Sequence, residues 1–172
     1  DFFFLDTKKL QKKLFNEIKG RIKLADKSVP FKDKRYTYWT KTTAKGNYSI
    51  HLRKKLNSGR QEVIWNGDKE KSKFNLPYFG LGDLSVSFDD KILGYSLDLK
   101  GSEYYSIYLR DLKTNKNFGN PIDNTNGNIV FSYDNKYLFY TKLDKNHRSK
   151  EIYLHKIKAK NNKDKLIYKE KI

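Results

Sequence analysis

The residues Phe88-Asp-Asp-Lys-Ile-Leu-Gly-Tyr95 are one of three copies of a single pattern in this sequence. Phe31-Lys-Asp-Lys-Arg-Tyr-Thr-Tyr38 precedes them by 57 residues, and Tyr133-Asp-Asn-Lys-Tyr-Leu-Phe-Tyr140 follows them by 45. In each copy an aromatic residue is followed by an Asp-Lys or Asn-Lys turn and then by residues that favour strands. This pattern is typical of a β-hairpin.

The second half of each unit repeats as well. Tyr48-Ser-Ile-His-Leu-Arg53 matches Tyr105-Ser-Ile-Tyr-Leu-Arg110, and Glu151-Ile-Tyr-Leu-His155 occupies the corresponding place. From the first aromatic residue of each unit to the isoleucine of this segment the separation is always 19 residues. Four antiparallel strands in a repeat of about 45 residues are typical of a propeller blade. We therefore predict an all-β fold, a partial β-propeller of about three four-stranded antiparallel blades.

The second unit shows how the four strands are assigned. We predict strands at Leu84–Phe88, Ile92–Leu97 and Tyr105–Leu112, with an outer strand near Lys116–Gly119 and a turn at Asp89-Asp90-Lys91. The blades are predicted to span about 27–76, 77–122 and 123–172. The first is longer because of an extra stretch from Asn66 to Leu81.

An N-terminal segment, residues 1–26, is predicted to contain one amphipathic helix from Asp6 to Leu24. Its apolar residues are spaced four apart, at Leu10, Leu14, Ile18 and Ile22. Asp6 or Thr7 can cap it, and Pro30 disfavours helical geometry in the residue before it. We interpret this helix as packing on the blades or on another domain rather than as a membrane helix.

Composition excludes several classes of protein. The chain has no cysteine, so neither a disulfide framework nor a thiolate metal site is available. The longest apolar run, Phe2–Leu5, is far shorter than the roughly 20 residues that span a bilayer. We expect a cytoplasmic protein without a membrane partner. Asp1 resembles an internal position, which predicts a piece of a longer polypeptide, the alternative being a leader removed upstream.

The net charge of +17 comes from lysines and arginines in nearly every block of ten residues. This spacing predicts an evenly charged surface. Such a surface binds nucleic acid or anionic lipid non-specifically. The sequence has no RNA-binding or helix-turn-helix signature, and its aromatic residues fall mostly on predicted strands. We therefore expect no specific nucleic-acid partner.

The sequence contains no complete motif for a catalytic nucleophile or a metal site. The nucleophile elbow requires Gly-x-Ser-x-Gly, and Gly94-Tyr-Ser96-Leu-Asp98 lacks the second glycine and lies in a predicted strand. We therefore expect Ser96 to be structural. His51, His147 and His155 are too scattered for a paired-ligand metal site, and the repeat places His51 and His155 on third strands.

Two further segments resemble ligand loops only superficially. Asp123-Asn-Thr-Asn-Gly127 has its glycine at the wrong position for a calcium loop, and we expect an inter-blade turn. Gly80-Leu-Gly82 lacks the remaining residues of a phosphate loop and is expected to be a turn. The sequence thus predicts no catalytic, cofactor-binding or metal-binding residue, and no cofactor.

Several segments resemble one known family. Residues 14–30, which read Leu-Phe-Asn-Glu-Ile-Lys-Gly-Arg-Ile-Lys followed by Ser-Val-Pro, resemble the entry to the propeller in the oligopeptidase B (protease II) group of the prolyl-oligopeptidase family. The early blades of that group are similar to further segments here, namely Gly80-Leu-Gly-Asp83, Val86-Ser-Phe-Asp-Asp-Lys91, Asp111-Leu-Lys-Thr-Asn115, Asn124-Thr125, Phe139-Tyr-Thr141 and His147-Arg148.

The resemblance implies a function for the chain as part of a larger enzyme. In this family a seven-bladed propeller covers an α/β-hydrolase domain that follows it and holds the serine, aspartate and histidine of a serine peptidase. The chain would then be a non-catalytic propeller segment that gates short peptides, with cleavage after Lys or Arg selected mainly in the hydrolase domain. Its partners would be the remaining blades, that domain and peptides. The alternative is a stand-alone propeller-like scaffold from a split or truncated gene, which binds a protein or an acidic partner.

Strand direction predicts which loops share a face. The loops Lys41–Asn47, Asp98–Tyr104 and Asp144–Lys150 should lie with Pro77–Gly82 and Asp123–Gly127, and the turns at Asp33, Asp89 and Asp134 should lie opposite. The resemblance makes the first face the candidate inter-domain face, with Pro77, Glu103, Tyr104 and Arg148 as candidate contacts. Asp89-Asp90 is then expected to be solvent-exposed. An open arc of blades exposes inter-blade surfaces, so we also expect self-association.

Overall fold

The computed structural model describes residues 7–158 and 164–171. The chain divides into two compact units, Asp1–Glu70 and Lys71–Ile172. Each unit contains antiparallel strands, and each is described by itself. Among the described residues, no helix has both the length and the apolar character needed to cross a membrane.

The helix α1 extends from Lys8 to Arg21, inside the predicted range of Asp6 to Leu24. Thr7 occupies the N-cap position but makes no side-chain capping bond, and Asp6 lies outside the described residues. Ile22 ends the helix because its backbone is extended. No residue of α1 is buried, and Leu10, Leu14, Phe15 and Ile18 are 46–62% exposed. The apolar stripe exists as predicted, but it contributes nothing to a core within the described residues.

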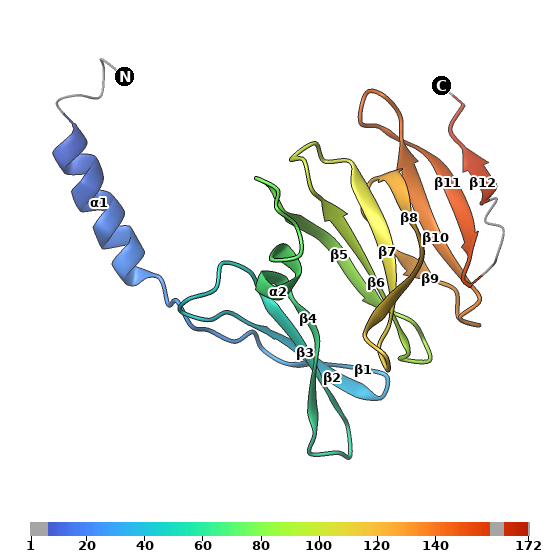
Figure 1. Cartoon of the computed structure of the whole chain (residues 1–172), viewed down its shortest axis with the longest axis horizontal. Coiled ribbons are helices and arrows are strands. Elements are labelled where there is room, and N and C mark those ends of the chain that lie inside the picture. The colour runs from blue at the N-terminus through green and yellow to red at the C-terminus, as the bar shows by residue number, and fades with distance from the viewer. Residues whose placement is uncertain (1–6, 159–163, 172) are drawn as a thin grey trace. The chain divides into compact units, whose positions relative to one another are not determined.

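The first blade consists of β1 (Phe31–Asp33), β2 (Tyr36–Lys41), β3 (Ile50–Lys55) and β4 (Gln61–Asn66). The strands are antiparallel and neighbour one another in chain order (Figure 1). Lys34, in the turn between β1 and β2, has a positive φ of 51°. The short helix α2 (Gly67–Lys71) follows β4.

The second blade consists of β5 (Gly80–Val86), β6 (Ile92–Asp98), β7 (Tyr105–Asp111) and β8 (Lys116–Thr125), again in chain order (Figure 1). Two predicted strand ends were wrong. β5 ends at Val86, so Phe88 lies in the turn, and β8 continues far beyond Gly119. The expected turn at Gly80–Gly82 is instead the start of β5, where the register with β6 shifts between Leu81 and Leu84.

The third blade consists of β9 (Val130–Phe131), β10 (Tyr137–Leu143), β11 (Ser149–Lys156) and β12 (Lys165–Lys169). β10 also pairs with β8 at a single position, Lys142 with Thr125, which connects the second and third blades. The fold is therefore the predicted partial β-propeller of three four-stranded antiparallel blades preceded by one amphipathic helix.

The core of the second unit lies between its two blades. Isoleucines and a leucine of the second blade pack against apolar residues of the third, and the cluster comprises Ile92, Ile107, Leu109, Ile122, Ile129, Phe131, Leu138, Tyr140 and Ile157. The lack of a side chain at Gly94 allows the two blades to approach each other closely. A Cβ atom at this position would lie only 3.0 Å from Cγ2 of Ile129 and 3.1 Å from the ring of Phe131. The other two copies of the repeat have Thr37 and Phe139 at this position.

Candidate functional site: the loop rim of the second and third blades

In the second unit, the strands are joined by longer loops at one end and by tight turns at the other. β6 begins after the turn that contains Asp89 and ends at the loop that contains Glu103, so these segments lie at opposite ends of one strand. We call the loops Asp98–Tyr104 and Asp144–Lys150 the loop rim. We call the turns 87–91 and 132–136 the turn rim. The strand directions predicted from the sequence are confirmed for these two blades.

A buried carboxylate organises the first loop of the loop rim. Asp98 is 1% exposed and accepts hydrogen bonds from the backbone N–H groups of Lys100 (2.8 Å), Gly101 (3.0 Å) and Glu103 (2.7 Å). Burial alone would raise the pKa of Asp98, but these hydrogen bonds outweigh it and lower the pKa below its ordinary value. The loop therefore folds around an ionised side chain, which holds Glu103 at a positive φ of 60°.

The second loop repeats this arrangement with Asp144. Its Oδ1 accepts from the backbone N–H groups of Asn146 (2.8 Å) and Arg148 (3.1 Å), and its Oδ2 contacts the guanidinium of Arg148 at 3.0 Å. The backbone hydrogen bond from Arg148 is the largest cause of the lowered pKa of Asp144. His147 adopts a positive φ of 59°, as Glu103 does in the first loop.

The two loops contact each other directly. The hydroxyl of Tyr104 donates to the carbonyl of Asp144 at 2.8 Å, and the rings of Tyr104 and His147 lie 4.1 Å apart. An open cavity of about 260 Å³ lies between them, lined by Glu103, Tyr105, Asn126, Leu143, His147 and Ser149. Glu103 is exposed, and its carboxylate makes no ion pair with any described residue.

Three of the four candidate contact residues therefore lie together. Tyr104 and Arg148 both contact Asp144, and Glu103 shares a cavity with His147. Pro77 is exposed and precedes Tyr78, whose ring lies 3.5 Å from the position of a Cβ on Gly101. Pro77 thus lies next in the chain to a residue that touches the loop rim.

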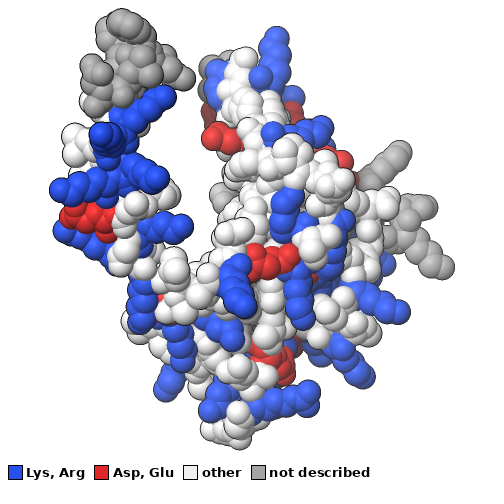
Figure 2. Space-filling model, turned by 60° about the vertical axis from the view of Figure 1, so that its left-hand side comes forward, with Lys and Arg blue, Asp and Glu red and all other residues white. Residues whose placement is uncertain are grey.

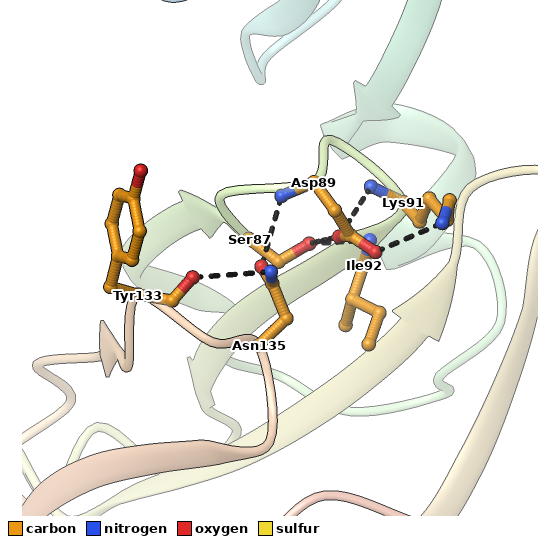
Figure 3. A network of polar contacts seen from close by, with 6 residues as sticks. All are labelled: Ser87, Asp89, Lys91, Ile92, Tyr133 and Asn135. Carbon is orange, nitrogen blue, oxygen red and sulfur yellow. Dashed lines mark hydrogen bonds and ion pairs between the residues drawn. The ribbon is translucent and has the colours of Figure 1, made fainter.

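The turn rim is a linked structure rather than two independent turns (Figure 3). The backbone N–H of Asp89 donates to Oδ1 of Asn135 at 2.9 Å, and the Ser87 hydroxyl donates to Oδ1 of Asp89 at 2.7 Å. The Ser87 hydroxyl oxygen in turn accepts from the N–H of Ile92 at 2.9 Å. The rings of Phe88 and Tyr133 lie 5.2 Å apart across the same junction.

The expected exposure of Asp89-Asp90 was therefore wrong. Asp90 is 5% exposed, and Asp89 is half-buried. For Asp89 the physical reason is the close approach of the two blades, which brings its turn into contact with the turn of the third blade. The sequence of one repeat predicts only a turn. The neighbouring blade, which the sequence of that repeat does not show, contributes to the burial of this turn.

We expect Asn135→Gly to lower the free energy of unfolding by about 1 kcal/mol more than Asn124→Gly does. Both asparagines have a positive φ, 60° and 61°, that glycine adopts readily, but only Asn135 bonds the neighbouring blade. Urea denaturation of the two variants measures the difference. Equal losses would contradict an energetic role for the bond between Asn135 and Asp89.

The fold agrees with comparisons to known proteins. The family model described as "Prolyl oligopeptidase, N-terminal beta-propeller domain" matches residues 1–172. The chain belongs to the prolyl oligopeptidase family. This propeller segment is 28% identical over 185 residues to dipeptidyl aminopeptidase BI of Pseudoxanthomonas mexicana, covering 99% of this chain and 26% of that protein. It is 22% identical to Protease 2 of Moraxella lacunata, covering 92% and 24%.

Solved structures show the same fold. The propeller segment is similar to oligopeptidase B from Leishmania major with a TM-score of 0.88 at 21% identity, covering 97% of this chain and 24% of that one. Its similarity to oligopeptidase B from Trypanosoma brucei has a TM-score of 0.81 at 23% identity, covering 96% and 23%. The chain spans about a quarter of the length of the curated relatives it matches.

The residues considered for chemistry are part of the blades of this propeller segment. Ser96 lies in β6, is fully buried, and its oxygen accepts from the N–H of Asp83 at 2.8 Å. His51 and His155 lie on β3 and β11, as predicted, whereas His147 lies in a loop. Asp123 belongs to β8 and not to the expected inter-blade turn.

No group of three or more histidine, cysteine, aspartate or glutamate side chains in the described ranges could hold a metal ion.

The polar centre that sequence reasoning missed is Asp98. A sequence signal for this role was present, because Asp98 follows a predicted strand and precedes Leu-Lys-Gly. Aspartate in such a position commonly accepts hydrogen bonds from the backbone N–H groups of the following turn. Basic side chains are scattered over the face drawn in Figure 2, with only a few acidic patches among them.

Proposed function

We propose that this chain is the non-catalytic propeller segment of an oligopeptidase B-like serine peptidase. In the intact enzyme it would gate the access of short peptides to a hydrolase domain that cleaves after Lys or Arg. The observation that carries the proposal is the match of the whole chain to the N-terminal propeller domain of the prolyl oligopeptidase family. The name of the relative Protease 2 supports the peptidase class.

We propose the loop rim as the face that meets the hydrolase domain. Its loops are held in one conformation by Asp98 and Asp144, so ordering them costs little when a partner binds. The exposed carboxylate of Glu103 and the exposed guanidinium of Arg148 offer charges of both signs to such a partner. Pro77 and Tyr104 would complete the contact surface.

The isolated chain should not hydrolyse dipeptide or tripeptide substrates with a basic residue before the scissile bond. Ser96, the serine nearest in sequence to an elbow motif, is buried in a strand and bonded to the backbone. Release of a chromophore from such substrates measures the activity, with trypsin as the positive control. Labelling of the purified chain by a serine-directed fluorophosphonate would contradict the proposal.

The coding sequence on either side of these 172 residues separates the proposal from its alternative. An in-frame continuation that encodes more blades and a Gly-x-Ser-x-Gly segment supports a peptidase. A stop codon directly after Ile172 favours a stand-alone scaffold.

A cytoplasmic location belongs to the same proposal, and cell fractionation tests it.

We also expect the isolated chain to self-associate. The third blade carries Ile152, Leu166 and Tyr168 at 38–51% exposure, and an open sheet edge at β12 adds unpaired backbone groups. Light scattering at tens of micromolar protein should detect species larger than a monomer. A strictly monomeric chain at that concentration would show that these exposed groups do not cause association.

A further inference from the structure

A buried polar group of three residues recurs in the blades. In the second blade Arg110, on the third strand, is 3% exposed and donates from Nη2 to the hydroxyl of Tyr95 at 3.0 Å. Its Nε donates to Oδ1 of Asn117, on the fourth strand, at 3.0 Å. The group therefore consists of a tyrosine, a cation and an acceptor on successive strands.

The first blade has a long cation at the equivalent position, because Arg53 precedes Arg110 by the repeat offset of 57 residues. Arg53 is 5% exposed, donates from Nε to Oε2 of Glu62 at 2.9 Å, and stacks 4.2 Å from the ring centre of Tyr36. Guanidinium groups thus fill this position in two of the three blades.

The third blade differs at this position. Its residue is His155, 5% exposed, whose Nδ1 lies 2.8 Å from Oδ1 of Asp164. The hydroxyl of Tyr140 donates to the other oxygen of Asp164 at 2.7 Å. An imidazole is shorter than an arginine side chain, so less of the space beside the third strand is filled.

An open cavity of about 380 Å³ lies beside His155, between β11 of the third blade and the β7–β8 hairpin of the second. Small-molecule sites usually have volumes of about 300–1,000 Å³ and mostly apolar walls. The apolar part of this cavity is formed by Ile107, Leu109, Phe118 and Ile122. The blades that carry these residues share one packed core, so the walls are held in place without a ligand.

The polar groups of the cavity favour a negative charge. A carboxylate only accepts hydrogen bonds, so Nδ1 of His155 carries the hydrogen that is shared with Asp164. Nε2 has no hydrogen-bond partner among the described residues. Lys116 and Lys158 also line the cavity, and Nζ of Lys158 lies 5.6 Å from the ring centre of Phe118.

One acidic side chain, Asp111, lines the same cavity. Its Oδ1 is occupied by its own turn, since it accepts from the N–H groups of Lys113 (2.9 Å) and Thr114 (2.8 Å) and from the Thr114 hydroxyl (3.2 Å). The charges of Lys158 and Asp111 attract each other, which leaves Lys116 as the cationic side chain of the cavity most available to a ligand.

We propose that this cavity binds a small carboxylic acid with an apolar body. The body would pack on Phe118 and Ile122, and the carboxylate would lie beside Lys116, with Lys158 at the mouth. Two sources share this chemistry, a free aliphatic acid and the C-terminal residue of a peptide with an apolar side chain.

The test measures binding of hexanoate and N-acetyl-leucine to the whole chain by two-dimensional amide NMR, with hexanamide and N-acetyl-leucinamide as neutral analogues. We expect saturable shifts of the amides of Phe118 and His155 with at least one acid, and about tenfold weaker binding of its neutral analogue. The acid that binds more tightly distinguishes the two sources. Absence of saturation by both acids at millimolar concentration overturns the proposal, as does equal binding of acid and neutral analogue.

Matched double variants test the lysines. Lys116→Gln with Lys158→Gln should weaken binding of the acid about tenfold and leave binding of the neutral analogue unchanged. Lys113→Gln with Lys156→Gln removes the same net charge from exposed positions outside the cavity and should leave both affinities unchanged. Equal weakening by the two double variants would mean that only net charge matters, and it would overturn the assigned site.

Discussion

Leu138→Ala should lower the free energy of unfolding by about 3 kcal/mol. Leu138 has no exposed surface and lies in the cluster that joins the second and third blades. Removing its side chain loses buried apolar area and leaves a cavity between two sheets. Because β10 is held by β9 and β11 on either side, the surrounding backbone has little freedom to close that cavity. Urea denaturation followed by circular dichroism measures the loss.

Leu166→Ala is the matched control for Leu138→Ala. Leu166 lies on β12 of the same blade but is 43% exposed, so its truncation should cost less than about 1 kcal/mol. The same chemical change at two positions of one blade then isolates the effect of burial. Similar losses for both variants would contradict the position of the core between the blades.

Asp98→Ala should lower the free energy of unfolding by about 2 kcal/mol at neutral pH. The substitution leaves three backbone N–H groups of one loop without their acceptor. Asp144→Ala provides a matched control, because its loop is more exposed and the released N–H groups can bond to water. We expect a loss of about 1 kcal/mol there. Amide hydrogen exchange of residues 100–104 should accelerate in Asp98→Ala and not in Asp144→Ala.

The effect of Asp98 should depend on pH in a defined direction. Its pKa is lowered in the folded state, so its contribution to stability is present above the unfolded-state value, near 3.8, and is lost as the pH falls through the folded-state value. The difference between the original chain and Asp98→Ala should therefore shrink as the pH falls below about 4. A difference that stays constant to lower pH would contradict a role for the ionised carboxylate.

The strands could be predicted because each repeat carries its own turn signals. Asp-Lys and Asn-Lys turns and the constant spacing to the third strand are local features, and local backbone preferences are enough to place them. Strand ends were less predictable. Phe88 and Tyr133 are aromatic residues of the type that favours strands. The hydroxyl oxygens of Ser87 and Ser132 nevertheless accept from the first N–H of the following strand, so each turn begins before its aromatic residue.

The outer strand of the second blade shows the opposite error. β8 contains Gly119 and Pro121, which normally interrupt a strand, so the sequence predicts a short element. In the structure two register shifts in its pairing with β7 accommodate these residues, and the strand continues to Thr125. The gain that offsets the irregular pairing is tertiary, since Ile122 reaches the core and Thr125 pairs with the next blade.

The arrangement of the candidate site was likewise predictable only in part. Strand direction alone predicts that Glu103 and the loop at Arg148 lie at one end of the blades, because antiparallel strands must alternate. The bond from Tyr104 to Asp144, the clamp between Asp89 and Asn135 and the cavity beside His155 all join segments of different blades. The repeat in the sequence was therefore sufficient to define the blades, since each blade is held by neighbouring hairpins. Contacts between blades depend on how two complete faces pack, and only the folded structure shows them.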